Sequence, residues 1–234
     1  MELPRNQALF HGSQSIIEKP LIGISNPYND YGPGFYCTME EELAKEWACS
    51  ETVDGYANCY SLDESGLRIM HLDGAEYNIL NWLALLVNHR RFRVSNDVAG
   101  NARAYLLDAF LPDIKEWDVI VGYRANDSYF AFANAFLNSV LSLTQLQEAM
   151  YLGKLGLQTV LISEKAFGQI TFIGHTVADH HVYYPLKMAR DQEARRIFRQ
   201  QRSLEQALDA VYVLDILRGG WENDDPRLRR NLFE

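Results

Sequence analysis

The sequence predicts an α+β fold in which one mixed domain carries a helical extension. Three observations support this prediction. Short β-prone segments and amphipathic helical patterns are interleaved irregularly, which favours an α+β arrangement over a parallel α/β sheet. The chain of 234 residues is long enough to bury a self-sufficient core. Hydrophobic residues make up 47% and charged residues 23% of the chain, as is typical of a globular protein.

The N-terminal segment is expected to alternate short strands with turns. Residues 8–10 form a strand that leads directly into His11. Residues 16–23 form a loop with a short strand piece. The Asn-Pro, Asn-Asp and Gly-Pro-Gly sequences within 25–34 indicate closely spaced turns. A second strand is expected at 35–37.

Capping patterns mark the starts of two helices. Thr38 and Glu41 have the spacing of a capping box, in which each residue satisfies a backbone N–H of the first turn. Thr144 and Gln147 repeat that spacing before a second helix. The first of these helices presents one apolar face, formed by Leu43, Ala44, Trp47 and Ala48.

Apolar runs and their flanking residues indicate the other elements of the domain. Strands are expected at 56–62, 67–70, 118–122, 157–163 and 170–173, and helices at 78–88 and 129–137. Asn126 and Asp127 are the expected N-cap of the helix at 129–137.

The pattern changes from His175 onward. Helices are expected at 185–202 and 203–217, the second with Ser203 and Gln206 in a capping pattern. The expected division is therefore a mixed domain at 1–174 and a helical extension at 175–234, packed on the core or on a partner.

Charge and cysteine content exclude some classes of protein. The formal net charge is −9 and the isoelectric point about 5.2, so bulk charge does not favour binding to nucleic acid or to an anionic membrane. Three cysteines are too few for a disulfide framework and favour a reducing compartment. No signal peptide and no membrane span are expected, so the sequence predicts a cytoplasmic protein.

The strongest functional pattern is His11-Gly12-Ser13 followed by Gly34 and Tyr36. A histidine beside glycine offers an imidazole together with an unobstructed backbone N–H and C=O, which suit a primary carboxamide. Glycines near a tyrosine allow a ligand to approach closely. The tyrosine ring then provides a flat surface for a planar group. Together these groups meet the needs of nicotinamide and its ribose.

The sequence resembles the ADP-ribosyltransferases of the diphtheria-toxin and poly(ADP-ribose) polymerase type, and more narrowly a bacterial family of uncharacterised proteins with such a domain. The resemblance spans roughly residues 8 to 173, and its matching stretches are 9–13, 30–38, 118–122, 125–127, 157–160 and 163–166. It implies a split β-sheet core that binds NAD as a substrate.

The resemblance also implies roles for individual residues. His11 matches the histidine that hydrogen-bonds the nicotinamide ribose, and Gly12 matches the backbone clamp on the carboxamide, with Ser13 bonding the same region. Tyr36 matches the ring that stacks on nicotinamide. Gln158 matches the third position, which is usually glutamate. Trp47 lies near the place of a second aromatic in some relatives, although its helical face also fits the core.

Glutamine at the third position changes the expected chemistry. Cleavage of the nicotinamide–ribose bond passes through an oxocarbenium-like state, which a carboxylate stabilises. Gln158 keeps a hydrogen bond but supplies neither negative charge nor a general base. Transfer of a single ADP-ribose is therefore expected rather than polymer elongation. Hydrolysis of NAD and non-catalytic binding of NAD or ADP-ribose stay open as alternatives. Glu164 is a nearby carboxylate that either assists or only caps the next turn.

Partners are indicated less clearly. The bacterial relatives suggest a toxin, defence or regulatory protein that modifies a protein or nucleic acid and is controlled by an antitoxin or regulatory protein. The C-terminal helices suggest a homodimer. Arginines within 89–93 or 187–202 are candidates for the NAD pyrophosphate or a nucleic acid, but the simpler interpretation is a solvated flank or a partner for the acidic 40–42 segment. His175, His180 and His181 are expected to be surface residues without a metal.

Overall fold

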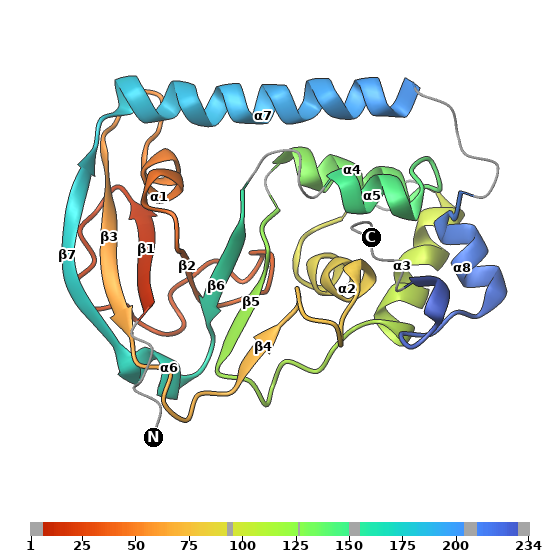
Figure 1. The fold of residues 1–234 in the computed structure, drawn as a ribbon, viewed down its shortest axis with the longest axis horizontal. Helices are drawn as coiled ribbons and strands as arrows, with labels where there is room; N and C mark the ends of the chain where they lie inside the picture. The colour runs from red at the N-terminus through yellow and green to blue at the C-terminus, as the bar shows by residue number, and fades with distance from the viewer. Residues whose placement is uncertain (1–6, 93–95, 126, 150–154, 204–209, 229–234) are drawn as a thin grey trace.

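The computed structural model describes residues 7–92, 96–125, 127–149, 155–203 and 210–228. Its centre is one sheet of seven strands in the order β4-β5-β6-β2-β1-β3-β7 (Figure 1). The strands are β1 (Gln7–Ser13), β2 (Phe35–Thr38), β3 (Gly55–Leu62), β4 (Ile69–His71), β5 (Val119–Tyr123), β6 (Leu157–Leu161) and β7 (Ile170–Ala178). Only β4 and β5 pair in parallel; the other neighbours are antiparallel. The predicted α+β class is confirmed at this level.

The sheet is divided near its middle. Strand β1 pairs along its full length with β3, but it meets β2 at a single position, Phe10 opposite Thr38. Strand β2 instead pairs with β6 over four residues, from Phe35 to Thr38. The sheet therefore opens between β1 and β2 beyond Phe10, and His11 lies on the side where it opens.

Helices cover the sheet unevenly. They are α1 (Glu41–Ala48), α2 (Ile79–His89), α3 (Asp97–Ala109), α4 (Asp127–Leu137), α5 (Leu143–Ala149), α6 (Glu164–Gln169), α7 (His180–Ser203) and α8 (Val213–Gly219), with a 3₁₀ turn at Pro226–Leu228. Helix α2 is the centre of the larger core, because every side chain from Ile79 to Val87 is buried. Helix α1 packs on β1 and β3 at the other half of the sheet.

Helix α2 begins with a capping box formed by two asparagines. The Asn78 side chain accepts from Leu80 N, and the Asn81 side chain accepts from Asn78 N at 2.8 Å. Both capping boxes expected from the sequence are wrong. Helix α1 begins after Glu40 without a side-chain cap, because Glu41 pairs with Thr176 and Lys45 instead.

The second box lies two residues earlier than expected from Thr144 and Gln147. Ser142 and Gln145 exchange side-chain-to-backbone hydrogen bonds of 3.0 and 3.2 Å. The earlier start buries Leu143 and Leu146 on the same face of α5.

The C-terminal region differs from the sequence prediction in two ways. Helix α7 begins five residues before the expected start and continues through Pro185. The single helix expected at 203–217 is wrong, since residues 210–212 are not helical and α8 begins only at Val213. The backbone of Val211 instead accepts from Leu143 N at 2.7 Å, which satisfies a free N–H at the start of α5. Gln206, the partner predicted for Ser203, lies outside the described residues.

The predicted boundary at 174/175 falls inside β7, which pairs with β3 on both sides of that point. Helix α7 then crosses the molecule from the β7 side to α4 and α5 (Figure 1). Glu46 of α1 and Arg190 of α7 form a bidentate ion pair with distances of 2.7 and 3.0 Å. No helix among the described residues is long and apolar enough to cross a membrane.

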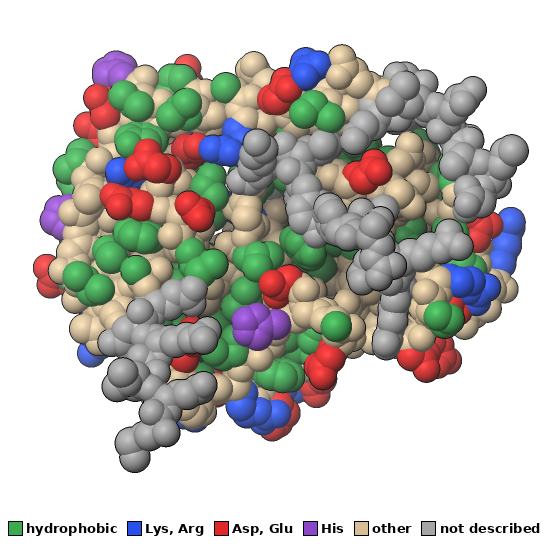
Figure 2. All heavy atoms as spheres, viewed as in Figure 1, with side chains coloured by type: hydrophobic (Ala, Val, Ile, Leu, Met, Phe, Trp, Pro, Cys, Tyr) green, Lys and Arg blue, Asp and Glu red, His purple; other side chains and the backbone are tan. Residues whose placement is uncertain are grey.

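The arginines of α7 are paired locally as well as with α1. Arg195 pairs with Asp191 and Arg196 pairs with Glu193 along the helix. On the face seen in Figure 2, acidic and basic side chains of the described residues are interspersed rather than separated. The local pairs match the interpretation of 187–202 as a solvated flank. The contact of Arg190 with α1 is to Glu46, which lies outside the acidic 40–42 segment suggested as a partner.

Candidate functional site

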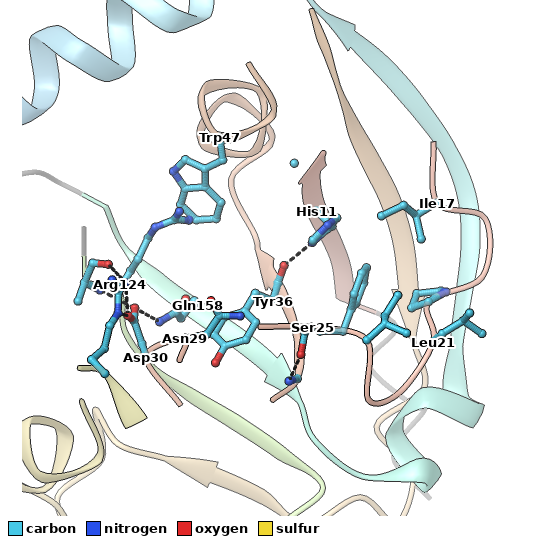
Figure 3. Close-up of a pocket in the computed structure, with 17 residues that line it drawn as sticks. His11, Ile17, Leu21, Ser25, Asn29, Asp30, Tyr36, Trp47, Arg124 and Gln158 are labelled. Atoms are coloured by element: carbon cyan, nitrogen blue, oxygen red, sulfur yellow. Dashed lines mark hydrogen bonds and ion pairs between the residues drawn. The ribbon is translucent and has the colours of Figure 1, made fainter. Parts of the chain in front are cut away.

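A cavity of about 420 Å³ lies where the sheet opens between β1 and β2. It brings together residues from β1, β2, β6, α1 and the turns at 17–34 (Figure 3). Six predicted site residues line it: His11, Gly12, Gly34, Tyr36, Trp47 and Gln158. Ser13 is not part of the lining, and its hydroxyl accepts from Ser15 N.

His11 is held in one orientation. Its Nδ1 lies 2.7 Å from the carbonyl oxygen of Tyr36, and because a carbonyl can only accept, Nδ1 carries the proton. The ring stacks on Phe35 with a centroid distance of 4.4 Å. Burial lowers the pKa of His11, and the nearby Arg124 lowers it further. The imidazole is therefore neutral at pH 7, with Nε2 as a hydrogen-bond acceptor.

Tyr36 presents its ring to the cavity, while its hydroxyl is used within the protein. The hydroxyl donates to Gly32 O at 2.7 Å and accepts from Tyr31 N at 3.0 Å. Burial raises the pKa of Tyr36, so the phenol stays protonated. The residue is suited to packing against a planar group and not to proton transfer.

Gln158 lies at the start of β6, opposite Thr38 of β2 and Gly122 of β5. The side chain is buried, and its Nε2 donates to Asp30 Oδ2 at 3.1 Å and to Tyr123 O at 3.2 Å. Both amide protons are therefore committed to acceptors in the protein. Its carbonyl oxygen is the group left to interact with a ligand.

Asp30, which sequence analysis did not single out, organises this side of the cavity. Its carboxylate accepts from Arg90 at 2.6 Å, from Ala125 N at 2.9 Å and from Gln158. The residue is 4% exposed. It connects the turns, the end of α2, the end of β5 and the start of β6. Because every oxygen is engaged, Asp30 positions its neighbours rather than acting as a general base.

Arg124 is the second residue missed from the sequence. It follows β5 directly, and its guanidinium lies over the indole of Trp47 (Figure 3). Trp47 thus contributes both to the wall of the cavity and to the edge of the core. A charged side chain immediately after a buried strand was the available signal. Arg124 lies outside the two basic segments at 89–93 and 187–202, so the charge pattern did not mark it as a candidate.

Gly12 and Gly34 are required for packing. A Cβ on Gly12 would lie 2.0 Å from Ala44 O of α1, and a Cβ on Gly34 would lie 2.6 Å from Val160 Cγ1. Gly12 therefore lets α1 approach β1 closely, which places Trp47 at the cavity.

Gly12→Ala should lower the free energy of unfolding by about 3 kcal/mol, since overpacking against backbone typically costs 1–3 kcal/mol or more. Urea denaturation provides the measurement. Gly174→Ala in β7 is the matched control, because a Cβ there meets no atom within 4 Å. Equal stability of the two variants would contradict the prediction.

The other candidates lie away from the cavity. Glu164 is the first residue of α6 and is exposed, consistent with a role at the helix start. The ligand atoms of Asp179, His180 and His181 lie within 4.8 Å of one another. His180 is half-buried and bonds Asp54 at 2.6 Å, and His175 is exposed. Asn126 lies outside the described residues.

A family model described as "Protein of unknown function (DUF3990)" matches residues 7–172. The chain belongs to this family. The region shared with the family contains every residue described above for the cavity, from His11 to Gln158, and ends within β7. No curated protein and no solved structure matched the chain.

Proposed function

We propose that the protein transfers one ADP-ribose from NAD to a macromolecular acceptor and releases nicotinamide. The observation that carries this proposal is the convergence of His11, Tyr36 and Gln158 on one cavity from three different strands. A neutral histidine acceptor, an aromatic ring and an amide carbonyl suit the ribose hydroxyls and the nicotinamide ring. Two arginines against one carboxylate give the cavity lining a net positive charge, which favours an anionic ligand.

The reaction breaks the bond between the ribose C1′ and the nicotinamide nitrogen. Nicotinamide leaves with the bonding electron pair as a neutral molecule, and the ribose passes through an oxocarbenium-like state. A nucleophile of the acceptor bonds to C1′ and loses its proton to solvent or to a base on the acceptor. His11 Nε2 and the Gln158 carbonyl orient the ribose, and Tyr36 packs against the leaving ring.

The lining of the cavity supports a single transfer over polymer elongation. Asp30 is the only carboxylate among the described lining residues, and its oxygens are engaged by Arg90, Ala125 and Gln158. No described residue of the cavity therefore offers a free carboxylate to activate a ribose hydroxyl as the next acceptor. We place the reaction in the bacterial cytoplasm, where the three free cysteines would stay reduced.

The test is incubation of the protein with bacterial lysate and NAD labelled on the adenylate phosphate. We expect released nicotinamide and label in a macromolecular fraction, with protease and nuclease treatment identifying the class of acceptor. His11→Ala should reduce both signals at least about 100-fold, in the range of lost positioning groups. Nicotinamide without labelled macromolecule would instead indicate NAD hydrolysis. Absence of both signals, with candidate partner proteins added, would overturn the proposal.

A further inference from the structure

Three arginines lie near two carboxylates beside the cavity. Two of these arginines form ion pairs with the carboxylates, and the third does not. Arg90 donates to Asp30 at 2.8 and 2.6 Å, and Arg190 binds both oxygens of Glu46. The charges of Asp30 and Glu46 also act on Arg124. Both carboxylates are already engaged by closer donors, so Arg124 is the surplus positive charge.

Arg124 is placed to receive an anion from the cavity. Its side chain lines the cavity, and Trp47 covers one face of the planar guanidinium. Within the described parts of the chain, no hydrogen bond or ion pair engages its N–H groups. Arg124 is half-buried, and this burial lowers the pKa of its guanidinium. A guanidinium that is stacked on one face, partly shielded from water and without a hydrogen-bond acceptor is stabilised when it binds an anion.

We propose that Arg124 binds the diphosphate of the dinucleotide, an assignment that rests on the proposed function. The planar fork of arginine matches two phosphate oxygens, and stacking on Trp47 fixes its orientation before the ligand arrives. Arg90 is less suited to this role because Asp30 already neutralises its charge and because its Nε and Nη2 donate to Asp30 and Ala125 O. Arg124 lies outside the segments 89–93 and 187–202, in which the sequence suggested arginines for the NAD pyrophosphate.

Calorimetric titration of the full chain tests the assignment with three probes: NAD, nicotinamide riboside and inorganic pyrophosphate. Arg124→Gln should weaken binding of NAD and pyrophosphate by about 10- to 100-fold, the range expected for a charged hydrogen bond. Nicotinamide riboside lacks phosphate, so Arg124→Gln should change the affinity for it by less than about threefold. Arg124→Lys keeps the positive charge but not the planar guanidinium, so it should show an intermediate loss of affinity.

Arg68→Gln is the matched control, since Arg68 lies on the surface with Glu116 and Trp117, and it should leave all three affinities unchanged. Equal losses for NAD and nicotinamide riboside would show that Arg124 only supports Trp47, and would overturn the assignment. Unchanged NAD binding in Arg124→Gln would overturn it while leaving the proposed function intact. Arg124-dependent binding of pyrophosphate without any binding of NAD would overturn the proposed function but retain an anion site. Failure of the wild-type chain to bind either probe would overturn both.

Discussion

Asp30→Ala should lower the free energy of unfolding by about 3 kcal/mol, the lower end of the 3–5 kcal/mol typical of a broken buried ion pair. The substitution leaves Arg90 without its carboxylate and removes the acceptor of Ala125 N and Gln158 Nε2. The lower end applies because the Arg90 side chain is 28% exposed and regains some hydration. Asp30→Asn keeps one carbonyl acceptor and should lose less.

Urea unfolding followed by tryptophan fluorescence measures this difference. Glu116→Ala is the matched control, because it breaks an exposed pair in which the side chains of Arg68 and Glu116 are 55% and 71% exposed. Such pairs contribute about 0–1 kcal/mol, so the control should remain close to the wild type. A loss below about 1 kcal/mol in Asp30→Ala would show that the carboxylate does not hold this side of the cavity together.

Local patterns were sufficient for much of the fold. The strands were found from β-prone runs, and the α+β class followed from their irregular mixture with helices. Helix starts were less predictable because several residues satisfy the same spacing rule. Ser142 and Gln145 compete with Thr144 and Gln147, and burial of Leu143, a tertiary effect, decides between them. The helix expected at 203–217 failed for a similar reason, since a hydrogen bond from Leu143 to Val211 O competes with helix formation.

The candidate site was also predicted where a local pattern was sufficient and missed where tertiary contacts decide. His11, Gly12, Gly34, Tyr36, Trp47 and Gln158 were named from a pattern, and they line one cavity. Asp30 and Arg124 were missed because their environment depends on contacts over long sequence separations. Asp30 reaches Ala125 and Gln158 across 95 and 128 residues. A turn-forming aspartate gives no sign in the sequence that it will be buried beside an arginine.

The environment of Gln158 gives a physical reason for an amide rather than a carboxylate at this position. Its Nε2 faces the carboxylate of Asp30 and the carbonyl of Tyr123, which are both acceptors. An ionised carboxylate in this place would meet two oxygens at hydrogen-bond distance with no donor between them. Gln158 therefore acts together with Asp30, and the negative charge of this pair is carried by Asp30.

Gln158→Glu should consequently destabilise the protein in a pH-dependent way. Burial beside Asp30 raises the pKa of the introduced carboxyl above its unfolded value of about 4.3. The folded state then binds more protons than the unfolded state, so stability relative to wild type falls as pH rises from about 4.3 and levels off above the folded pKa. A shift of about 3 units would give a loss of about 4 kcal/mol at pH 8.

Unfolding measured between pH 5 and pH 8 tests this prediction, with Gln200→Glu as the matched control on α7. Gln200 is exposed and accepts from Arg196, so that variant should stay within about 0.5 kcal/mol of wild type at every pH. A loss for Gln158→Glu that does not vary with pH would contradict the argument from charge. The double variant Asp30→Asn with Gln158→Glu provides the stronger check. The amide of the asparagine at position 30 can donate to the new carboxylate. The double variant should therefore lose at least about 1 kcal/mol less free energy of unfolding than the sum of the two single losses. Additive losses would mean that the two side chains do not act as a pair.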